Sequence, residues 1–555
     1  MTVRRVLLAA SLLLGLLATG IILGEPVPEA LRHGHAEQSL RVLDREGRLM
    51  REVRTGSGRS AQAVSAHELS EHVIPALLAA EDARFYEHPG IDGLAIVRAT
   101  LQAIRHGRVV SGASTLTQQL ARTVKPRQRT ERGKLSEILS ALAIERALSK
   151  QQILEEYLNR VEFGPNVQGI EAASRSYFDK PARELSLAEA AALVSLPRGP
   201  TLYDPNRGVE RLRRRRDRVL GRMRERGLAG TAAIERALAE PIRLQLRSSE
   251  VKAWHFTRAV TGKLMPSSSQ RVREIETTLD SALQREVETL VREAALRLRA
   301  YDASAAAVVV VDNATGDVLA YVGAPDFFSE AALGQNDGVL ALRQPGSALK
   351  PFVYALALER GMTPASLLPD IELHFPSSQN DYSPRNYDNR FHGPVRLREA
   401  LASSLNVPAV YLADRLGVPA VLAYLQELGF SSLSRSAQHY GVALALGDGE
   451  VKLAELAGAY ATLANGGERT ALRYVRSLRD AGGRRVPVPI AARERVMSAR
   501  AAAQITHILS DDLARAGGFG RGSVLAFSFP VAAKTGTSKG LRDNWAVGYT
   551  RERTV

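Results

Sequence analysis

Three short motifs in the second half of the chain constrain its fold more than any other feature. They are Ser347-x-x-Lys350, Ser404-x-Asn406 and Lys534-Thr535-Gly536, in that order. A serine hydroxyl becomes a nucleophile only when a base takes its proton, and a lysine can be that base only if burial or nearby positive charge lowers its pKa. The motifs can therefore act together only if the fold brings three distant segments to one point.

The residues around the first motif indicate the start of a helix. Pro345 and Gly346 are typical of a helix entry, which puts Ser347 in the first turn. Lys350 then lies on the same face, because residues three apart are neighbours on a helix. We expect Ser347 to be the nucleophile of an acyl-transfer site.

The two later motifs supply what such a site needs. Ser404 offers a hydroxyl that relays a proton, and Asn406 offers an amide that holds the lysine or the substrate backbone. Lys534 adds a cation on a strand-like segment, and Gly536 permits another backbone to come close. The hydroxyl groups beside that glycine suit a substrate carboxylate.

Strand-like segments flank a long helical stretch in this half of the chain. Ala305–Val311 and Asp317–Gly323 predict a β-hairpin, and strand-like pieces return at Val531–Ser538 and Trp545–Tyr549. Strands, helices and strands again are typical of an α+β domain, which we expect over residues 301–555.

The first residues predict an exported chain. Arg4 and Arg5 precede an uncharged run, Val6–Gly24, that is long enough to span a bilayer. Positive charge before the run keeps the N-terminus inside and puts the rest across the membrane. A cleavable signal peptide is the alternative, because Ala18 and Gly20 form a weak cleavage pattern. We favour an uncleaved anchor, since the apolar run continues beyond that point.

The composition narrows the chemistry. The chain has no cysteine, which excludes disulfides, thiolate metal sites and a cysteine nucleophile. Its net charge of +15 indicates an anionic partner. No basic platform interleaved with aromatic residues is present, so the partner is not a nucleic acid. The basic run Arg211–Arg218 predicts a solvated helix face, with contact to anionic lipid headgroups as the alternative.

Residues 66–238 predict a mainly helical domain, because apolar residues recur three and four apart. Within it, Ala79–Asp92 collects acids and bases at a helix end. Glu81 can act as a general base if burial or a second acid raises its proton affinity, and a salt-bridged helix end is the alternative. The basic segment Arg122–Lys134 is what a pyrophosphate leaving group needs.

The order of the three serine-site motifs resembles the transpeptidase domain of penicillin-binding proteins. The resemblance implies that Ser347 attacks the penultimate D-Ala carbonyl of a D-Ala-D-Ala stem peptide and passes the acyl group to an amine. It assigns Lys350 as the base, Ser404 as the proton relay and Asn406 as the orienting amide. No cofactor is needed, and β-lactams would trap Ser347 as a stable acyl-enzyme.

The same resemblance assigns the third motif to the terminal carboxylate of the substrate. Lys534 and Thr537 would bind it, with Thr535 and Gly536 between them, and the backbone N–H groups of Ser347 and Thr537 would form an oxyanion hole. A hydrolytic carboxypeptidase or β-lactamase, a penicillin-sensing domain and a non-catalytic scaffold stay open as alternatives.

Several stretches of the first domain resemble glycosyltransferase family 51, the lysozyme-like peptidoglycan polymerases. They include Ala79–Asp92, Ser111–Leu120 (SGASTLTQQL) and Gly169–Lys180. The resemblance implies that Glu81 deprotonates the 4-hydroxyl of the acceptor sugar on lipid II. That hydroxyl would displace undecaprenyl pyrophosphate from the growing glycan strand with inversion.

The resemblance also implies a pyrophosphate site. Glu137, Lys134 and Arg122 would hold the leaving group, with Gln118 as a further substrate contact and Mg²⁺ or Mn²⁺ as the divalent cation. Arg122 stands where many members have lysine, and Gly133 stands where many have arginine before the lysine. Because arginine and lysine present different geometries, we expect one phosphate contact to differ from the family pattern.

We therefore expect a multi-domain protein of the cytoplasmic membrane with its catalytic domains outside. The expected segments are an anchor at 1–24, a juxtamembrane hairpin at 25–60, a glycosyltransferase domain at 61–240, a linker at 241–300 and a transpeptidase domain at 301–555. Asp543–Val555 predicts a strand, a turn and the start of another strand, so we expect that domain to be C-terminally incomplete. Expected partners are lipid II, stem peptides, the membrane and other wall-synthesis proteins.

Overall fold

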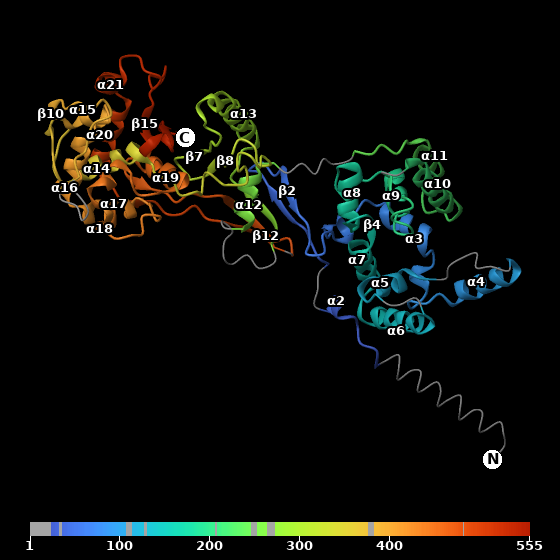
Figure 1. The fold of residues 1–555 in the computed structure, drawn as a ribbon. Coiled ribbons are helices and arrows are strands. Elements are labelled where there is room, and N and C mark those ends of the chain that lie inside the picture. The colour runs from blue at the N-terminus through green and yellow to red at the C-terminus, as the bar shows by residue number, and fades with distance from the viewer. Residues whose placement is uncertain are drawn as a thin grey trace, which may run out of the picture. The chain divides into compact units, whose positions relative to one another are not determined.

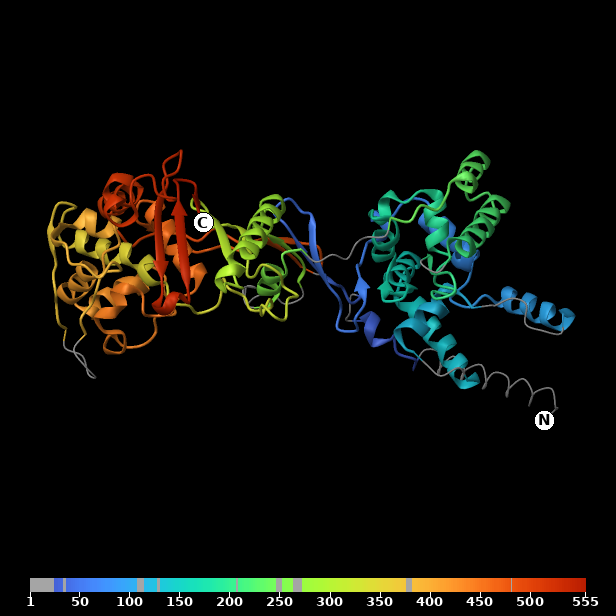
Figure 2. The same cartoon turned by 45° about the horizontal axis from the view of Figure 1, so that its top comes forward.

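The computed structural model describes residues 24–32, 36–106, 114–126, 130–205, 208–245, 252–262, 272–375, 382–480 and 482–555. The chain divides into two compact units, shown in Figures 1 and 2. The first unit contains Met1–Arg41 and Glu52–Glu250, and the second contains Val42–Arg51 and Val251–Val555. None of the described helices combines the length and the apolar character that a membrane crossing requires. The predicted anchor lies outside the described residues apart from Gly24.

The first unit is mainly helical, as its sequence pattern predicts. Its longer helices are α3 (Val73–Glu81), α4 (Gly93–His106), α5 (Leu116–Val124), α6 (Glu131–Ala147), α7 (Lys150–Arg160), α8 (Ile170–Phe178), α9 (Leu187–Leu193), α10 (Val209–Glu225) and α11 (Thr231–Ala239). Helix α9 lies at the centre and is buried apart from Glu189, and α3, α10 and α11 pack around it. Its alanines allow this close packing, and Ser186 caps its N-terminus together with Glu189.

A small sheet completes the first unit. Its strands are β3 (Ser60–Ala61), β5 (Val167–Gln168) and β4 (Glu162–Gly164), in that order across the sheet. Strand β3 runs parallel to β5, and β4 runs antiparallel to it.

The second unit is built on a five-stranded antiparallel sheet. Across the sheet the strands are β15 (Ala532–Thr537), β16 (Asn544–Tyr549), β17 (Arg553–Thr554), β7 (Val308–Asp312) and β8 (Val318–Val322). The predicted hairpin is β7 and β8, and β17 pairs with both β16 and β7. Val310 packs against α13 (Ser281–Leu298), whereas Ala532 and Val547 belong to the large core of the helical region. The expected α+β architecture is confirmed.

The helical region carries most of the second unit's core. Its helices are α14 (Lys350–Glu359), α15 (Leu397–Ala402), α16 (Val407–Leu416), α17 (Val418–Glu427), α18 (Ala437–Tyr440), α19 (Leu453–Ala464), α20 (Ala499–Ser510) and α21 (Asp512–Phe519). Helix α14 is buried along nearly its whole length, and α15, α16, α17 and α20 pack against it. The lysine of the first motif is the first residue of this buried helix, so the core fixes its position.

A second five-stranded sheet corrects the expected linker at 241–300. Most of the described part of that stretch is folded as α12 (Trp254–Gly262), β6 (Val272–Thr277) and the whole of α13, and α13 buries Val287 and Val291 on the main sheet. Strand β6 lies between β12 (Val475–Asp480) and β1 (Leu40–Leu43), with β13 (Arg485–Pro487) and β2 (Leu49–Val53) at the edges. The expected juxtamembrane hairpin within 25–60 corresponds to β1 and β2, at residues 40–53, and is thus part of this sheet.

Candidate active sites

The nucleophile candidate of the second unit sits in a tight turn against strand β15. Ser347 lies in the short 3₁₀ helix Gly346–Leu349, immediately before α14. Gly346 has φ +56°, and a side chain there would overlap the backbone of Thr537. A β-carbon on Gly536 would likewise overlap the Pro345 carbonyl. Glycine at both positions therefore lets the serine turn touch the third motif.

Lys350 is completely buried and is held by the second motif. Its Nζ donates to the carbonyl oxygens of Ser404 (2.6 Å) and Leu405 (2.9 Å) and to Oδ1 of Asn406 (2.7 Å). Burial, and secondly the charge of Lys534, hold the pKa of Lys350 well below its usual range. A lysine whose pKa is lowered, one turn from a serine hydroxyl, can serve as the base that takes its proton.

Lys534 joins the second and third motifs. Its Nζ donates to Oγ of Ser404 at 2.9 Å and to the Thr535 carbonyl at 2.8 Å. Burial, and secondly the charge of Arg515, lower the pKa of Lys534 to about 7. Ser404 has φ +62°, which a non-glycine residue adopts at a cost of about 1–3 kcal/mol. This conformation lets one lysine contact its carbonyl while the other contacts its hydroxyl.

Hydrogen bonds from residues outside the three motifs hold Asn406 in place. The backbone N–H of Asn406 donates to Oδ1 of Asn386 at 2.8 Å. The amide of Asn386 donates in turn to both carboxylate oxygens of Asp370, at 2.8 and 2.9 Å. Asp370 is fully buried, and His392 also contacts its carboxylate. The chain from Asp370 to Lys350 fixes the base through successive hydrogen bonds.

The candidate base of the first unit lines an open cleft of about 930 Å³. Glu81 is the last residue of α3, and its carboxylate is nearly buried. Six arginines also line the cleft: Arg84, Arg98, Arg122, Arg198, Arg222 and Arg226. The walls therefore suit a polyanionic substrate.

The two carboxylate oxygens of Glu81 have different surroundings. Oε2 accepts a hydrogen bond from Nε2 of Gln119 at 3.1 Å, and Oε1 of that glutamine accepts from the Tyr157 hydroxyl. Burial, and secondly the charge of Glu81, raise the pKa of Tyr157, so the phenol remains a donor. Oε1 of Glu81 is buried without a hydrogen-bond partner, and Arg215 is 3.7 Å away.

The predicted pyrophosphate residues form one cluster. Nζ of Lys134 donates to Oε1 of Glu137 at 2.6 Å and to Oε1 of Gln118 at 3.1 Å. Arg122 lies 3.9 Å from the other oxygen of Glu137. Gln118 is buried and orients Lys134, whereas its neighbour Gln119 reaches Glu81. Arg122 belongs to the cleft lining and connects this cluster with the cleft.

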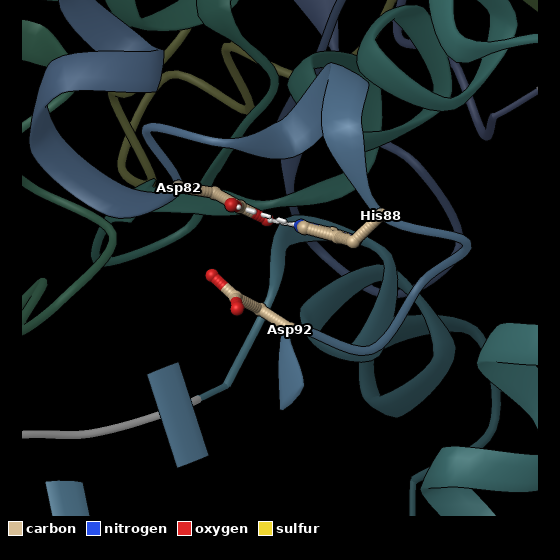
Figure 3. A group of neighbouring side chains, drawn as sticks. All are labelled: Asp82, His88 and Asp92. Atoms are coloured by element: carbon tan, nitrogen blue, oxygen red, sulfur yellow. Dashed lines mark hydrogen bonds and ion pairs between the residues drawn. The ribbon is translucent and has the colours of Figure 1, made fainter. Parts of the chain in front are cut away.

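Asp82, His88 and Asp92 are the candidate metal ligands among the described residues (Figure 3). Nδ1 of His88 accepts from the Gly90 N–H, so Nε2 carries the proton that it shares with Asp82. Asp82 also accepts from the Leu116 N–H, and the Arg84 guanidinium binds Asp92. A protonated imidazole nitrogen and two engaged carboxylates do not fit a cation. This group instead ties the turn after Glu81 to helix α5.

Four residues that the structure places at these sites had no motif to identify them. Gln119 was visible only as half of a Gln-Gln pair, and Arg215 only as one member of the basic run. Arg215 and Arg216 are buried, whereas the other four arginines of the run are exposed, so the solvated-face prediction is wrong for these two. Asp370 and Asn386 act through hydrogen bonds to residues far along the chain, and no local pattern indicates them.

Comparisons with known proteins agree with this two-site architecture. Residues 46–224 match the transglycosylase family model, and residues 306–554 match the penicillin binding protein transpeptidase domain. Penicillin-binding protein 1C of Escherichia coli is 38% identical over 89% of this chain and 60% of its own length. Penicillin-binding protein 1F of Bacillus subtilis is 33% identical over 93% of this chain and 72% of its own length.

The fold has solved counterparts. Penicillin-binding protein 1A from Haemophilus influenzae matches with a TM-score of 0.58 and 20% identity, covering 94% of this chain and 88% of that one. The chain spans 60% of the length of the E. coli relative. With both family models matched in order on one chain, this protein belongs to the class A penicillin-binding proteins, which combine a transglycosylase domain with a transpeptidase domain.

Proposed function

We propose that this chain is a bifunctional peptidoglycan synthase. Its first unit polymerises lipid II into glycan strands, and its second unit cross-links stem peptides through an acyl-enzyme on Ser347. The observation that carries the proposal is the meeting of three separate motifs around Lys350, whose burial lowers its pKa. Burial that lowers the pKa of a lysine one helical turn from a serine has a clear chemical use and a high cost without one.

Acyl transfer starts when Lys350 takes the proton of Ser347 as Oγ attacks the D-Ala carbonyl. The negative oxygen that forms is stabilised by the backbone N–H groups of Ser347 and Thr537, which the glycine contacts keep close together. Ser404, whose hydroxyl accepts from Lys534, delivers a proton to the leaving D-Ala amine as the C–N bond breaks, and the proton that Lys350 took from Ser347 replaces it. An acceptor amine then attacks the ester and loses a proton along the same route in reverse, and Lys350 returns that proton to Oγ as the ester bond breaks and releases Ser347.

Glycan polymerisation uses Glu81 as the base for the acceptor 4-hydroxyl. The hydroxyl attacks the anomeric carbon of the growing strand, and the bond to the lipid pyrophosphate breaks with inversion. Lys134 and Arg122 bind the departing pyrophosphate, and Glu137 orients Lys134. The arginine-lined cleft supports this role, because charge-assisted bonds to phosphate are the strong ones.

The divalent cation that the resemblance implies has no fitting resident site at Asp82, His88 and Asp92, so no step above uses one. Chelation with EDTA is expected to leave the thermal unfolding of the protein unchanged. A requirement of polymerisation for Mg²⁺ or Mn²⁺ would then assign the ion to the substrate pyrophosphate. A fall in melting temperature on chelation would contradict this assignment.

The membrane location is part of the proposal. Residues 1–24 would anchor the chain in the membrane. Helix α4 also favours a membrane location, and it extends away from the other helices of its unit (Figure 1). Leu94, Val97, Leu101 and Ile104 lie on one face of α4, and each is more than half exposed. Such a face suits the headgroup boundary of the bilayer that supplies the lipid substrate. Replacing Leu101 and Ile104 by glutamate should reduce binding to liposomes.

Two separate variants test the proposed function. The purified protein should polymerise lipid II and bind fluorescent penicillin. Glu81→Gln should abolish polymerisation while labelling continues, and Ser347→Ala should abolish labelling while polymerisation continues. A chain that polymerises equally well with Glu81→Gln, or that is labelled equally well with Ser347→Ala, would refute the assignment of that site.

A further inference from the structure

Helix α10 brings a buried cation to the candidate base of the first unit. Arg215 is 5% exposed, and its Nε and NH2 atoms are buried without a hydrogen-bond partner. NH2 of Arg215 lies 3.7 Å from Oε1 of Glu81, which also lacks a hydrogen-bond partner. Two unsatisfied charged groups that face each other in a protein interior are costly, so their retention calls for an explanation.

The neighbouring residue shows what a structural arginine looks like at this helix. Arg216 is also buried, but its guanidinium donates to the carbonyls of Glu240 and Leu238 and binds Asp217. It fixes the end of α11 to α10. Among the described residues Arg215 has no comparable set of bonds, and its guanidinium approaches Glu81 at the end of α3.

The same face of α10 also holds the backbone that carries Glu81. Arg222 is seven residues after Arg215, so both point in the same direction. NH1 of Arg222 donates to the carbonyl of Ala80 at 3.1 Å, at the C-terminal end of α3. A cation there offsets the partial negative charge of the helix end. Helix α10 thus holds the main chain just before Glu81 and faces its side chain.

We propose that Arg215 is a positioning residue for Glu81. It holds the carboxylate with Oε1 turned inward, so that Oε2 is left with Gln119 at the cleft wall to accept the proton of the incoming hydroxyl. The 3.7 Å separation leaves the pair free to shorten when the substrate excludes water. The inference rests on the proposed polymerase function, and it assigns no contact with substrate to Arg215.

The role predicts a division between activity and stability. Arg215→Met removes the charge and keeps much of the volume. We expect kcat for lipid II polymerisation to fall about 100-fold with KM changed less than twofold, the scale typical of a misplaced catalytic group. The melting temperature should stay the same or rise, because the variant removes a buried charge with poor compensation. Arg215→Lys should recover part of the rate.

Arg216→Ala is the matched control. It should lower the melting temperature, because carbonyls of α11 lose their partners, while kcat of the folded protein stays close to wild type. Guanidinium ions added to Arg215→Ala should restore part of its rate, and the same concentration of urea should not. Wild-type kcat in Arg215→Met, or a loss of rate explained by unfolding alone, would overturn the proposal.

The outcomes separate this inference from the function on which it rests. An inactive wild-type protein, or full activity in Glu81→Gln, would reject the polymerase assignment. An active wild type that loses its rate in Glu81→Gln but keeps it in Arg215→Met would reject the role of Arg215 alone.

Discussion

The two candidate sites place charge in opposite ways. In the second unit, Lys350 and Lys534 are buried among carbonyl, amide and hydroxyl groups, and none of the hydrogen-bond partners of either Nζ in the described part of the chain is a carboxylate. In the first unit, Lys134 is half exposed and paired with Glu137, and arginines line an open cleft. The difference follows from the chemistry. A lysine that must accept a proton needs a site that disfavours its charge, whereas a lysine that must bind pyrophosphate needs one that keeps it.

The largest expected effect tests the buried side of this contrast. Lys350→Met should slow the acylation of Ser347 by fluorescent penicillin about 1,000-fold, because general-base catalysis is lost. Lipid II polymerisation should be unchanged. Lys252→Met, which removes an exposed lysine of the same unit, should alter neither reaction. Labelling at the wild-type rate in Lys350→Met would show that Lys350 is not the base that activates Ser347.

The second prediction tests the close contact between the serine turn and strand β15, which only glycine at position 346 permits. Gly346→Ala should reduce acylation about 100-fold, since the new methyl group separates the serine turn from Thr537. Gly361→Ala is the control: it has φ +92° but open space around it, so it should cost only about 1 kcal/mol of stability. Equal acylation rates in the two variants would show that contact with Thr537 is unimportant.

The exposed side of the contrast predicts a smaller effect. Lys134→Met should lower kcat/KM for lipid II polymerisation about 30-fold, corresponding to the loss of about 2 kcal/mol from a charged hydrogen bond. Penicillin labelling should not change. Arg183→Met removes an exposed cation that does not line the cleft and should have no effect. High salt should weaken the wild type more than the Lys134 variant, and identical salt dependence would contradict the role in phosphate binding.

The smallest effect concerns pH. Arg515 lowers the pKa of Lys534, which burial has already reduced, to about 7. Lys534 is charged below that pH, so binding of a carboxylate-bearing substrate should decline as the pH rises through about 7. Arg515→Gln should raise the pKa and move this alkaline limb upward by about one pH unit. Arg515→Lys keeps the charge and should leave the limb in place. Acylation rates measured from pH 5 to 9 test this expectation. An alkaline limb that stays in place in Arg515→Gln would contradict the effect of Arg515 on Lys534.

The sequence predicted those parts of the fold and the sites that local patterns encode. The helical first unit, the β7–β8 hairpin and the three motifs follow from periodicity and spacing. The sequence does not predict which of Gln118 and Gln119 contacts Glu81. Adjacent helical residues point about 100° apart, and the pattern does not say which of the two side chains is directed at Glu81. Asp370 and Asn386 were missed since their partners are distant. The stretch 241–300 was mistaken for a linker because the partners of β6 come from residues 40–43 and 475–480.

The hairpin at residues 40–53 has a consequence for synthesis of the chain. Its strand β1 pairs with β6, yet residues 52–250, the bulk of the first unit, are made in between. Roughly 220 residues separate β2 from β6, which the ribosome takes about 10 to 40 s to produce. The first unit thus has time to fold as an insertion while β1 and β2, with Val42 and Met50 still uncovered, await their partner. Assembly of the second unit is set by the order of translation.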